Sequence, residues 1–313
     1  MPLLDLGATI AIGLRFFTII YLTGLGGLFS ERSGIVNIGL EGILIVGTVM
    51  GAWGSVEFGP VEGLLIGAGG GLLFSLVHAV ATVTFRVDHI VSGVVINVVA
   101  IGLARFLSQL FFGQATQSDP GIPGLDTINI PLLSSLPLGL GQAFRAMSPV
   151  VIVAFLLTIP AVFVLNRTRF GLRLRSAGEN PEAARTLGVR VAPLRYSGVA
   201  ISGALGGLAG AFLAIEINGL FREGQTQGLG FIALAALILG NWQPLRLLVG
   251  ALLFGIAQAI PLRLADAPVI SILPEEFIRT IPYVVTIIAI AGLVGRVHPP
   301  AAAGRAYEGA RAT

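Results

Sequence analysis

The chain has 313 residues, of which 55% are hydrophobic and 11% are charged, and its formal net charge is +3. A soluble domain carries about 25% charged residues, so this composition excludes an ordinary soluble protein. Apolar runs of about 20 residues, long enough to cross a ~30 Å hydrocarbon core, recur along the whole chain. The expected fold class is therefore all-α, a polytopic bundle of transmembrane helices.

Hydropathy predicts nine apolar spans, with eight or ten allowed by the uncertainty of their boundaries. The first run follows no basic segment and no small-residue cleavage site stands out, which indicates a retained helix rather than a signal peptide. The long run 226–262 is divided at "NWQP", where Pro244 suits a turn. The spans are 7–29, 34–56, 61–85, 90–112, 149–165, 197–217, 226–242, 245–262 and 272–295.

Arginine predicts the orientation of these spans. Seven arginines lie in residues 166–196 and three in the tail 296–313, and both segments should be cytoplasmic under the positive-inside rule. Counting spans from them places the amino terminus outside. The proline-rich segment 113–148 is then an extracytoplasmic cap. The basic residues are thus explained by membrane topology, and no nucleic-acid partner is expected.

Two further features concern packing. Glycines at small-xxx-small spacing, such as Gly203 with Gly207 and Gly67 with Gly71, predict close helix contacts within one bundle. Trp53 and Trp242 lie near span ends, which is typical of side chains anchored at the membrane interface.

Motifs for energy conversion and catalysis are missing from the sequence. The chain contains no lysine, so a phosphate-binding G-x-x-x-x-G-K-[ST] loop is impossible. It contains no cysteine, and its three histidines are scattered, so we expect no metal site and no catalytic residue. Uphill transport would need an ion gradient or a separate ATPase subunit.

Residues 178–188, "GENPEAARTLG", are predicted to form a short helix with strong end signals in the basic segment. Asn180 is a good N-cap, Pro181 suits the first helical position, and Gly188 suits a left-handed C-cap. Ala183, Ala184 and Leu187 should share one apolar face, with Glu182 near the positive helix end. Such a helix is either a connector on lipid headgroups or an element docked into a partner protein.

Polar residues inside the predicted spans are candidates for a solute pathway. Asn37 and Glu41 are spaced i and i+4 and should share a helix face, and Asn97 lies near Ser92 in the fourth span. The alternative is structural: a buried amide or hydroxyl bonds a backbone carbonyl, and Glu41 pairs with Arg15 or Arg105. For Arg15, Arg105 and Glu216 we favour the structural interpretation.

Four segments resemble one family. "GLRLRSAGENPEAARTLGV" (171–189) is similar to the coupling loop of bacterial ABC-importer permeases for sugars, nucleosides and branched-chain amino acids. "SERSGIVNIGLEGILIVG" (30–47), "FRVDHIVSGVVINVVAIGL" (85–103) and "GLGFIALAALILGNWQPLRLLVGALLFG" (228–255) resemble other parts of these permeases. The likeness is greatest to the shorter permease of the paired nucleoside and simple-sugar systems.

The resemblance implies a type II ABC-importer permease fold in a bacterial inner membrane. It implies a second permease, a cytoplasmic ATPase that binds ATP and Mg²⁺, and an extracytoplasmic solute-binding protein as partners, with no cofactor in this chain. The segment that it implies docks into the ATPase comprises Glu179, Asn180, Pro181, Glu182, Ala183, Ala184, Arg185, Leu187 and Gly188.

The function expected is nucleoside import by alternating access. Simple sugars or branched-chain amino acids are alternative solutes for the same machinery. A different class is a stand-alone transporter driven by protons through Glu41 or Glu216. A purely structural scaffold explains neither the coupling-like loop nor the polar residues within the spans.

Overall fold

The structure, a computed structural model, describes residues 6–135, 137, 140–265, 275–293 and 297–307. Over these residues it is helical apart from connecting segments and two isolated β-bridges, which confirms the expected all-α class. The elements are α1 (Leu6–Arg32), α2 (Leu40–Phe58), α3 (Pro60–Ala79), η1 (Val80–Thr84), α4 (His89–Phe112), α5 (Pro131–Ser134), η2 (Leu140–Phe144), α6 (Pro149–Leu156), α7 (Thr158–Arg167), α8 (Arg169–Glu179), α9 (Pro181–Thr186), α10 (Val191–Phe212), η3 (Leu213–Asn218), α11 (Leu229–Leu239), α12 (Pro244–Ala265) and α13 (Glu275–Leu293).

Seven of the described helical segments are long and apolar enough to cross a membrane. In several of them adjoining elements combine, as η1 does with α3, α7 with α6 and η3 with α10. Helix α13 covers most of the expected span 272–295, whose first and last residues lie outside the described ranges. The chain is therefore a polytopic membrane protein.

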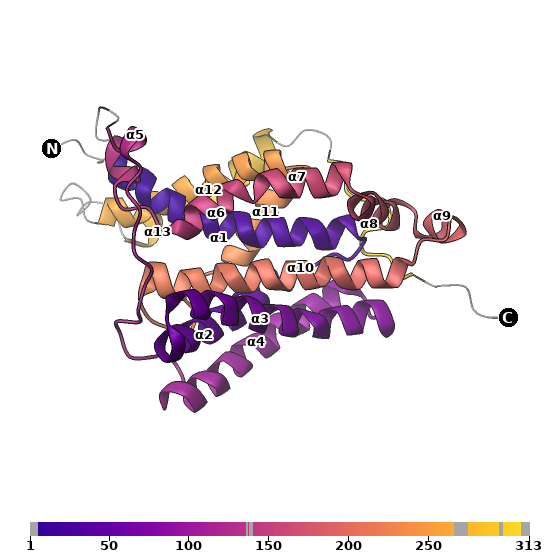
Figure 1. Cartoon of the computed structure of the whole chain (residues 1–313), viewed down its shortest axis with the longest axis horizontal. Coiled ribbons are helices and arrows are strands. Elements are labelled where there is room, and N and C mark those ends of the chain that lie inside the picture. Colours follow the sequence, from indigo (N-terminus) through magenta and orange to yellow (C-terminus); the bar gives the residue numbers. More distant parts are fainter. Residues whose placement is uncertain (1–5, 136, 138–139, 266–274, 294–296, 308–313) are drawn as a thin grey trace.

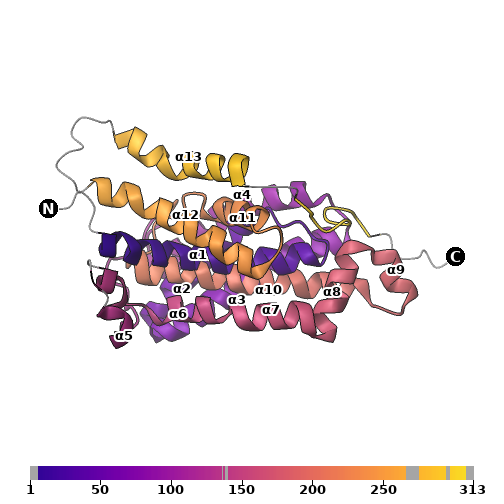
Figure 2. The same ribbon diagram turned by 90° about the horizontal axis from the view of Figure 1, so that it is seen from above.

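The long helices run side by side along the longest axis of the molecule (Figures 1 and 2). Helix α1 packs against α10, α11 and α12, while α10 packs against α2 and α3. Small residues allow the closest contacts: a Cβ added at Gly207 would lie 2.3 Å from the carbonyl oxygen of Gly67. The expected close packing of glycine-rich helices within one bundle is confirmed.

The second span begins later than hydropathy predicts. Residues 33–39 are not helical, and α2 starts only at Leu40. Gly34 has φ +97°, a left-handed conformation that residues with a side chain rarely adopt, so the chain turns there before the helix can start. Asn37 consequently lies outside α2, and the prediction that it shares a helix face with Glu41 is wrong.

Side chains from the neighbouring helices satisfy the irregular backbone of residues 33–39. His78 Nε2 lies 3.1 Å from the Val36 carbonyl oxygen, and His89 Nδ1 accepts from the Val36 N–H at 3.3 Å. Asn97 Nδ2 donates to the Ile38 carbonyl at 3.1 Å. Non-helical backbone at membrane depth needs such internal partners because lipid supplies none.

The seventh predicted span, 226–242, also differs from the helix that the structure contains. Its helix, α11, has only 11 residues and begins at Leu229. At about 1.5 Å per residue it is roughly 16 Å long, about half of a ~30 Å hydrocarbon core. Residues 219–228 precede it as a non-helical segment with left-handed glycines at 219, 224 and 228. We call residues 219–228 the entry loop.

The two ends of the bundle carry different segments (Figure 1). The start of α1 and the α5 region lie at one end, called here the α5 end. Helices α8 and α9 lie at the opposite end, the α9 end, where residues 297–307 also pack. Residues 113–148 are joined to the bundle by backbone hydrogen bonds, among them Ser118 N–H to the Phe221 carbonyl at 2.9 Å.

Candidate functional site

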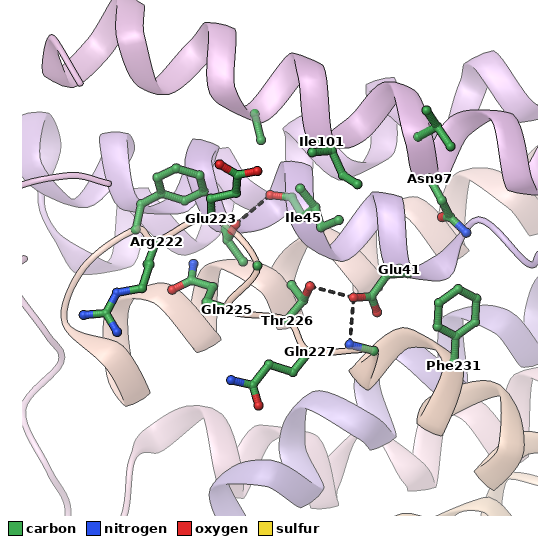
Figure 3. Close-up of a pocket in the computed structure, with 16 residues that line it drawn as sticks. Glu41, Ile45, Asn97, Ile101, Arg222, Glu223, Gln225, Thr226, Gln227 and Phe231 are labelled. Carbon is green, nitrogen blue, oxygen red and sulfur yellow. Dashed lines mark hydrogen bonds between the residues drawn. The ribbon is translucent and has the colours of Figure 1, made fainter. Parts of the chain in front are cut away.

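A cavity of about 320 Å³ lies between α2, α4, the entry loop and the start of α11 (Figure 3). This volume is within the range of about 300–1,000 Å³ that is usual for small-molecule sites. The lining is largely apolar, with polar groups concentrated on the entry loop. The cavity is lined by Glu41, Ile45, Thr48, Asn97, Val98, Ile101, Ala104, Phe221, Arg222, Glu223, Gly224, Gln225, Thr226, Gln227, Gly228 and Phe231.

Glu41 fixes the entry loop and the start of α11. Its Oε1 accepts from the Thr226 hydroxyl at 2.6 Å and from the Gly228 N–H at 3.0 Å, and its Oε2 accepts from the Gly230 N–H at 2.7 Å. The first N–H groups of a helix lack partners within the helix and carry its positive dipole end. A carboxylate from α2 therefore caps α11 across the cavity wall.

The other predicted pathway residues hold the fold together. Asn97 lines the cavity, but its Oδ1 accepts from the Gly42 N–H at 2.7 Å and its Nδ2 is bonded to Ile38. Ser92 lies 2.8 Å from His78 Nδ1, and Asn37 Nδ2 donates to the Ser202 hydroxyl at 3.0 Å. Neither Ser92 nor Asn37 lines the cavity.

The structure also places the charged residues named in the sequence analysis. Arg105 pairs with Glu223 at 2.6 Å, and among the described residues Glu41 forms an ion pair with neither Arg105 nor Arg15, so the alternative of a Glu41–Arg pair is wrong. Glu216 Oε1 accepts from the Leu125 N–H at 2.7 Å, in agreement with a structural role.

Trp242 is not an interfacial anchor. It is 6% exposed, and its Nε1 donates to Glu31 Oε2 at 2.6 Å in the interior of the α9 end. Trp53 stacks on Phe111, with ring centroids 4.5 Å apart.

Sequence reasoning missed the entry loop. The polar run "FREGQTQG" (221–228) could have predicted a loop. Hydropathy instead assigned its residues "TQG" to the apolar span 226–242. Among the described residues, no group of three or more His, Cys, Asp or Glu side chains is arranged to hold a metal ion.

The short helix at the α9 end has the predicted local features. Asn180 Oδ1 accepts from the Ala183 N–H at 3.0 Å, Pro181 is the first helical residue, and Gly188 has φ +79°. The exposed pair of Glu182 and Arg185 is 3.3 Å apart. These features are local, so the sequence could predict them.

The predicted apolar face of this helix is divided in the structure. Ala184 is 3% exposed and packs with Ala177 and Val191, whereas Leu187 is 84% exposed. Ala183 is also exposed. Because the helix ends after Thr186, Leu187 leaves the helical face and points into solvent. Ala184 therefore packs the helix against the bundle, and Leu187, just after its last residue, projects into solvent.

Residues 297–307 brace the end of α8, directly before this short helix, against the bundle. The Ala302 N–H donates to the Gly178 carbonyl at 2.8 Å, and the Ala301 N–H donates to Glu179 Oε2 at 3.1 Å. Glu179 also lies 3.6 Å from Arg32 Nη1, so it faces the bundle. The sequence predicted a cytoplasmic tail here but gave no sign of these contacts.

Comparisons with known proteins identify the family of the chain. A family model described as a branched-chain amino acid transport system permease component matches residues 9–290. The nucleoside ABC transporter permease protein NupC of Lactococcus lactis is 43% identical, over 94% of each chain. The guanosine ABC transporter permease protein NupQ of Bacillus subtilis is 42% identical, over 91% of this chain and 92% of NupQ. A putative glucose ABC transporter permease protein of Haloferax volcanii, TsgC13, is 35% identical, over 90% of each. No solved structure gives a significant match.

Proposed function

This chain belongs to the family of branched-chain amino acid transport system permease components, and from that premise we propose that it forms the solute pathway of a nucleoside importer. The two relatives above 40% identity, both named for nucleoside or guanosine transport, support the choice of solute. ATP hydrolysis takes place in separate ATPase subunits, which bind ATP and Mg²⁺, so this subunit needs no cofactor of its own and is not an enzyme.

The observation that carries the proposal is the geometry of α9. A leucine that is 84% exposed projects from a short helix at an end of the bundle rich in arginine. Exposure alone does not distinguish this leucine, but a large apolar side chain on a short capped helix at the arginine-rich end suits an apolar contact with a cytoplasmic partner. The Asn180 cap and the buried Ala184 fix the backbone of this helix. We assign the α9 end to the cytoplasm and Leu187 to the contact with an ATPase.

The cavity supports a pathway that binds solute weakly. Glu41 and Asn97 line the cavity, but their polar atoms already form hydrogen bonds within the chain, so they offer little to a solute. A second permease subunit would meet this one along the open side of the cavity. A solute-binding protein would dock at the α5 end, where residues 113–148 connect to the entry loop.

The proposal can be tested by capturing the ATPase subunit of a nucleoside ABC importer from the same organism with the detergent-solubilised permease. Leu187→Asp should reduce capture at least tenfold, because it places a charge in an apolar contact. Leu132→Asp is a matched control, since Leu132 is 82% exposed in α5 at the opposite end. Equal capture by both variants, or solute transport by the purified chain alone in a proton gradient, would contradict the proposal.

A further inference from the structure

Backbone strain is concentrated at the two ends of α11. Four described residues other than glycine have positive φ, and three of them flank this helix. Gln227, with φ +46°, stands two residues before it, and Asn241 and Trp242 follow it with φ +49° and +52°. Residues held in such conformations persist only where the surroundings impose them, and they cluster at ligand sites and switches.

The surroundings of Gln227 impose its conformation from both sides. Glu41 Oε1 accepts hydrogen bonds from the residue before it, Thr226, and from the residue after it, Gly228. The Gln227 N–H donates to the Gly224 carbonyl at 3.2 Å, and the Tyr283 hydroxyl donates to the Gln227 carbonyl at 3.4 Å. The backbone of Gln227 is therefore fully engaged in holding one geometry.

The side chain of Gln227, in contrast, has no hydrogen-bond partner among the described residues. It is exposed and points away from Glu41 (Figure 3). An amide offers two donors and one acceptor. On the same loop, Gln225 Nε2 is buried and also has no partner among the described residues.

Gln227 lies where two cavities meet. The cavity described above shares Gln227, Gly228 and Phe231 with a second one of about 280 Å³, which is bordered by α13. Phe231 is 48% exposed and presents an aromatic ring to both. A free amide next to an exposed aromatic ring suits a planar heterocycle, because the ring can stack while the amide bonds adjacent donor and acceptor atoms on the edge.

We infer that Gln227 is the residue through which this subunit contacts its solute, and that it reads the base rather than the ribose of a nucleoside. This inference rests on the proposed function. Glu41 acts as a positioning residue, because its carboxylate holds the turn that presents the amide. The turn imposed at Gln227 places its amide at the border that the two cavities share.

The test uses the complete transporter in proteoliposomes, with binding protein saturated with adenosine. Gln227→Gly removes the amide and tolerates positive φ, and it should lower uptake per ATP hydrolysed about tenfold, the equivalent of one lost hydrogen bond of ~1.4 kcal/mol. Gln227→Asn, which also tolerates this backbone and keeps an amide, should retain much of the uptake. Gln117→Ala, an exposed glutamine outside both cavities, should match wild type.

Photolabelling with 8-azidoadenosine separates contact with the solute from a purely structural role of Gln227, because only residues near the bound nucleoside are labelled. In the wild-type complex it should mark the peptide 221–231, and excess adenosine should prevent the labelling. Wild-type uptake by Gln227→Gly, or equal losses in the glycine and asparagine variants with no labelled peptide, would overturn the inference. If the wild-type complex captures no ATPase and moves no nucleoside, the proposed function itself fails, and the base-reading role fails with it.

Discussion

The two ends of α11 are held in the same way but in different surroundings. At its start, Glu41 accepts three hydrogen bonds and borders an open cavity. Beyond its last turn, Glu31 is 3% exposed and accepts from Trp242, while Arg32 donates twice to the Trp242 carbonyl, at 3.0 and 2.8 Å. The Glu41 attachment therefore borders the cavity, whereas the hydrogen bond between Glu31 and Trp242 is buried in the bundle.

Helix α11 therefore connects the cavity to the α9 end. Arg32 bonds the turn that follows α11 and also lies 3.6 Å from Glu179, the last residue of α8. Through Gly178 and Glu179 the same region meets residues 301–302. We expect movement of α9 to reach the entry loop through these contacts, because packed elements with fixed ends shift together.

The largest effect is expected from Glu41→Ala. It leaves the Gly228 and Gly230 N–H groups without their acceptor in an apolar environment, and bonds to a charged group are the costly ones to lose. We expect a loss of about 3 kcal/mol in the free energy of unfolding and no measurable uptake. Thermal unfolding of the purified protein measures the first, and Glu41→Gln should lose less because it keeps one acceptor.

A smaller effect is expected at the opposite end of α11. Trp242→Phe keeps an aromatic side chain but removes the side-chain donor to buried Glu31, at a cost of about 2 kcal/mol. Trp53→Phe is the matched control, because Trp53 makes ring contacts and no hydrogen bond among the described residues. If both substitutions shift the unfolding temperature equally, the attachment through Glu31 does not stabilise this end.

Removal of residues 297–313 should affect coupling more than assembly. The truncated chain loses the bonds to Gly178 and Glu179 but keeps the α9 cap and Leu187. We expect ATPase capture to continue and solute moved per ATP to fall several-fold. Removal of residues 308–313 alone spares these bonds and should have no such effect. Unchanged coupling after the longer truncation would show that the brace is dispensable.

The smallest effect is expected from Glu223→Gln. Its pair with Arg105 is exposed on the arginine side, and water and salt screen such an ion pair so that it contributes little to stability. Uptake should stay within about twofold of wild type at physiological salt. A severe loss would mean that this pair closes the cavity and is more than a surface contact.

The regions that the sequence predicted well are those determined by neighbours along the chain. Asn180, Pro181 and Gly188 act within one short helix, so residue type and spacing were sufficient to place its ends. The starts of α2 and α11 depend on side chains far away in the sequence, such as Asn97 and Glu41. Hydropathy assigns residues 34–39 and 226–228 to apolar spans, and only the folded bundle supplies the hydrogen-bond partners that allow their backbone to be non-helical.

The most direct test of ATP-driven nucleoside import is uptake of radiolabelled adenosine into proteoliposomes. The vesicles contain either this permease alone or the permease with its companion permease and ATPase, with loaded binding protein added on the side of the α5 end. We predict uptake only in the complete system, only with ATP, and with strong reduction by Leu187→Asp. Uptake by the permease alone, driven by a proton gradient and unaffected by Leu187→Asp, would contradict a role for α9 in coupling.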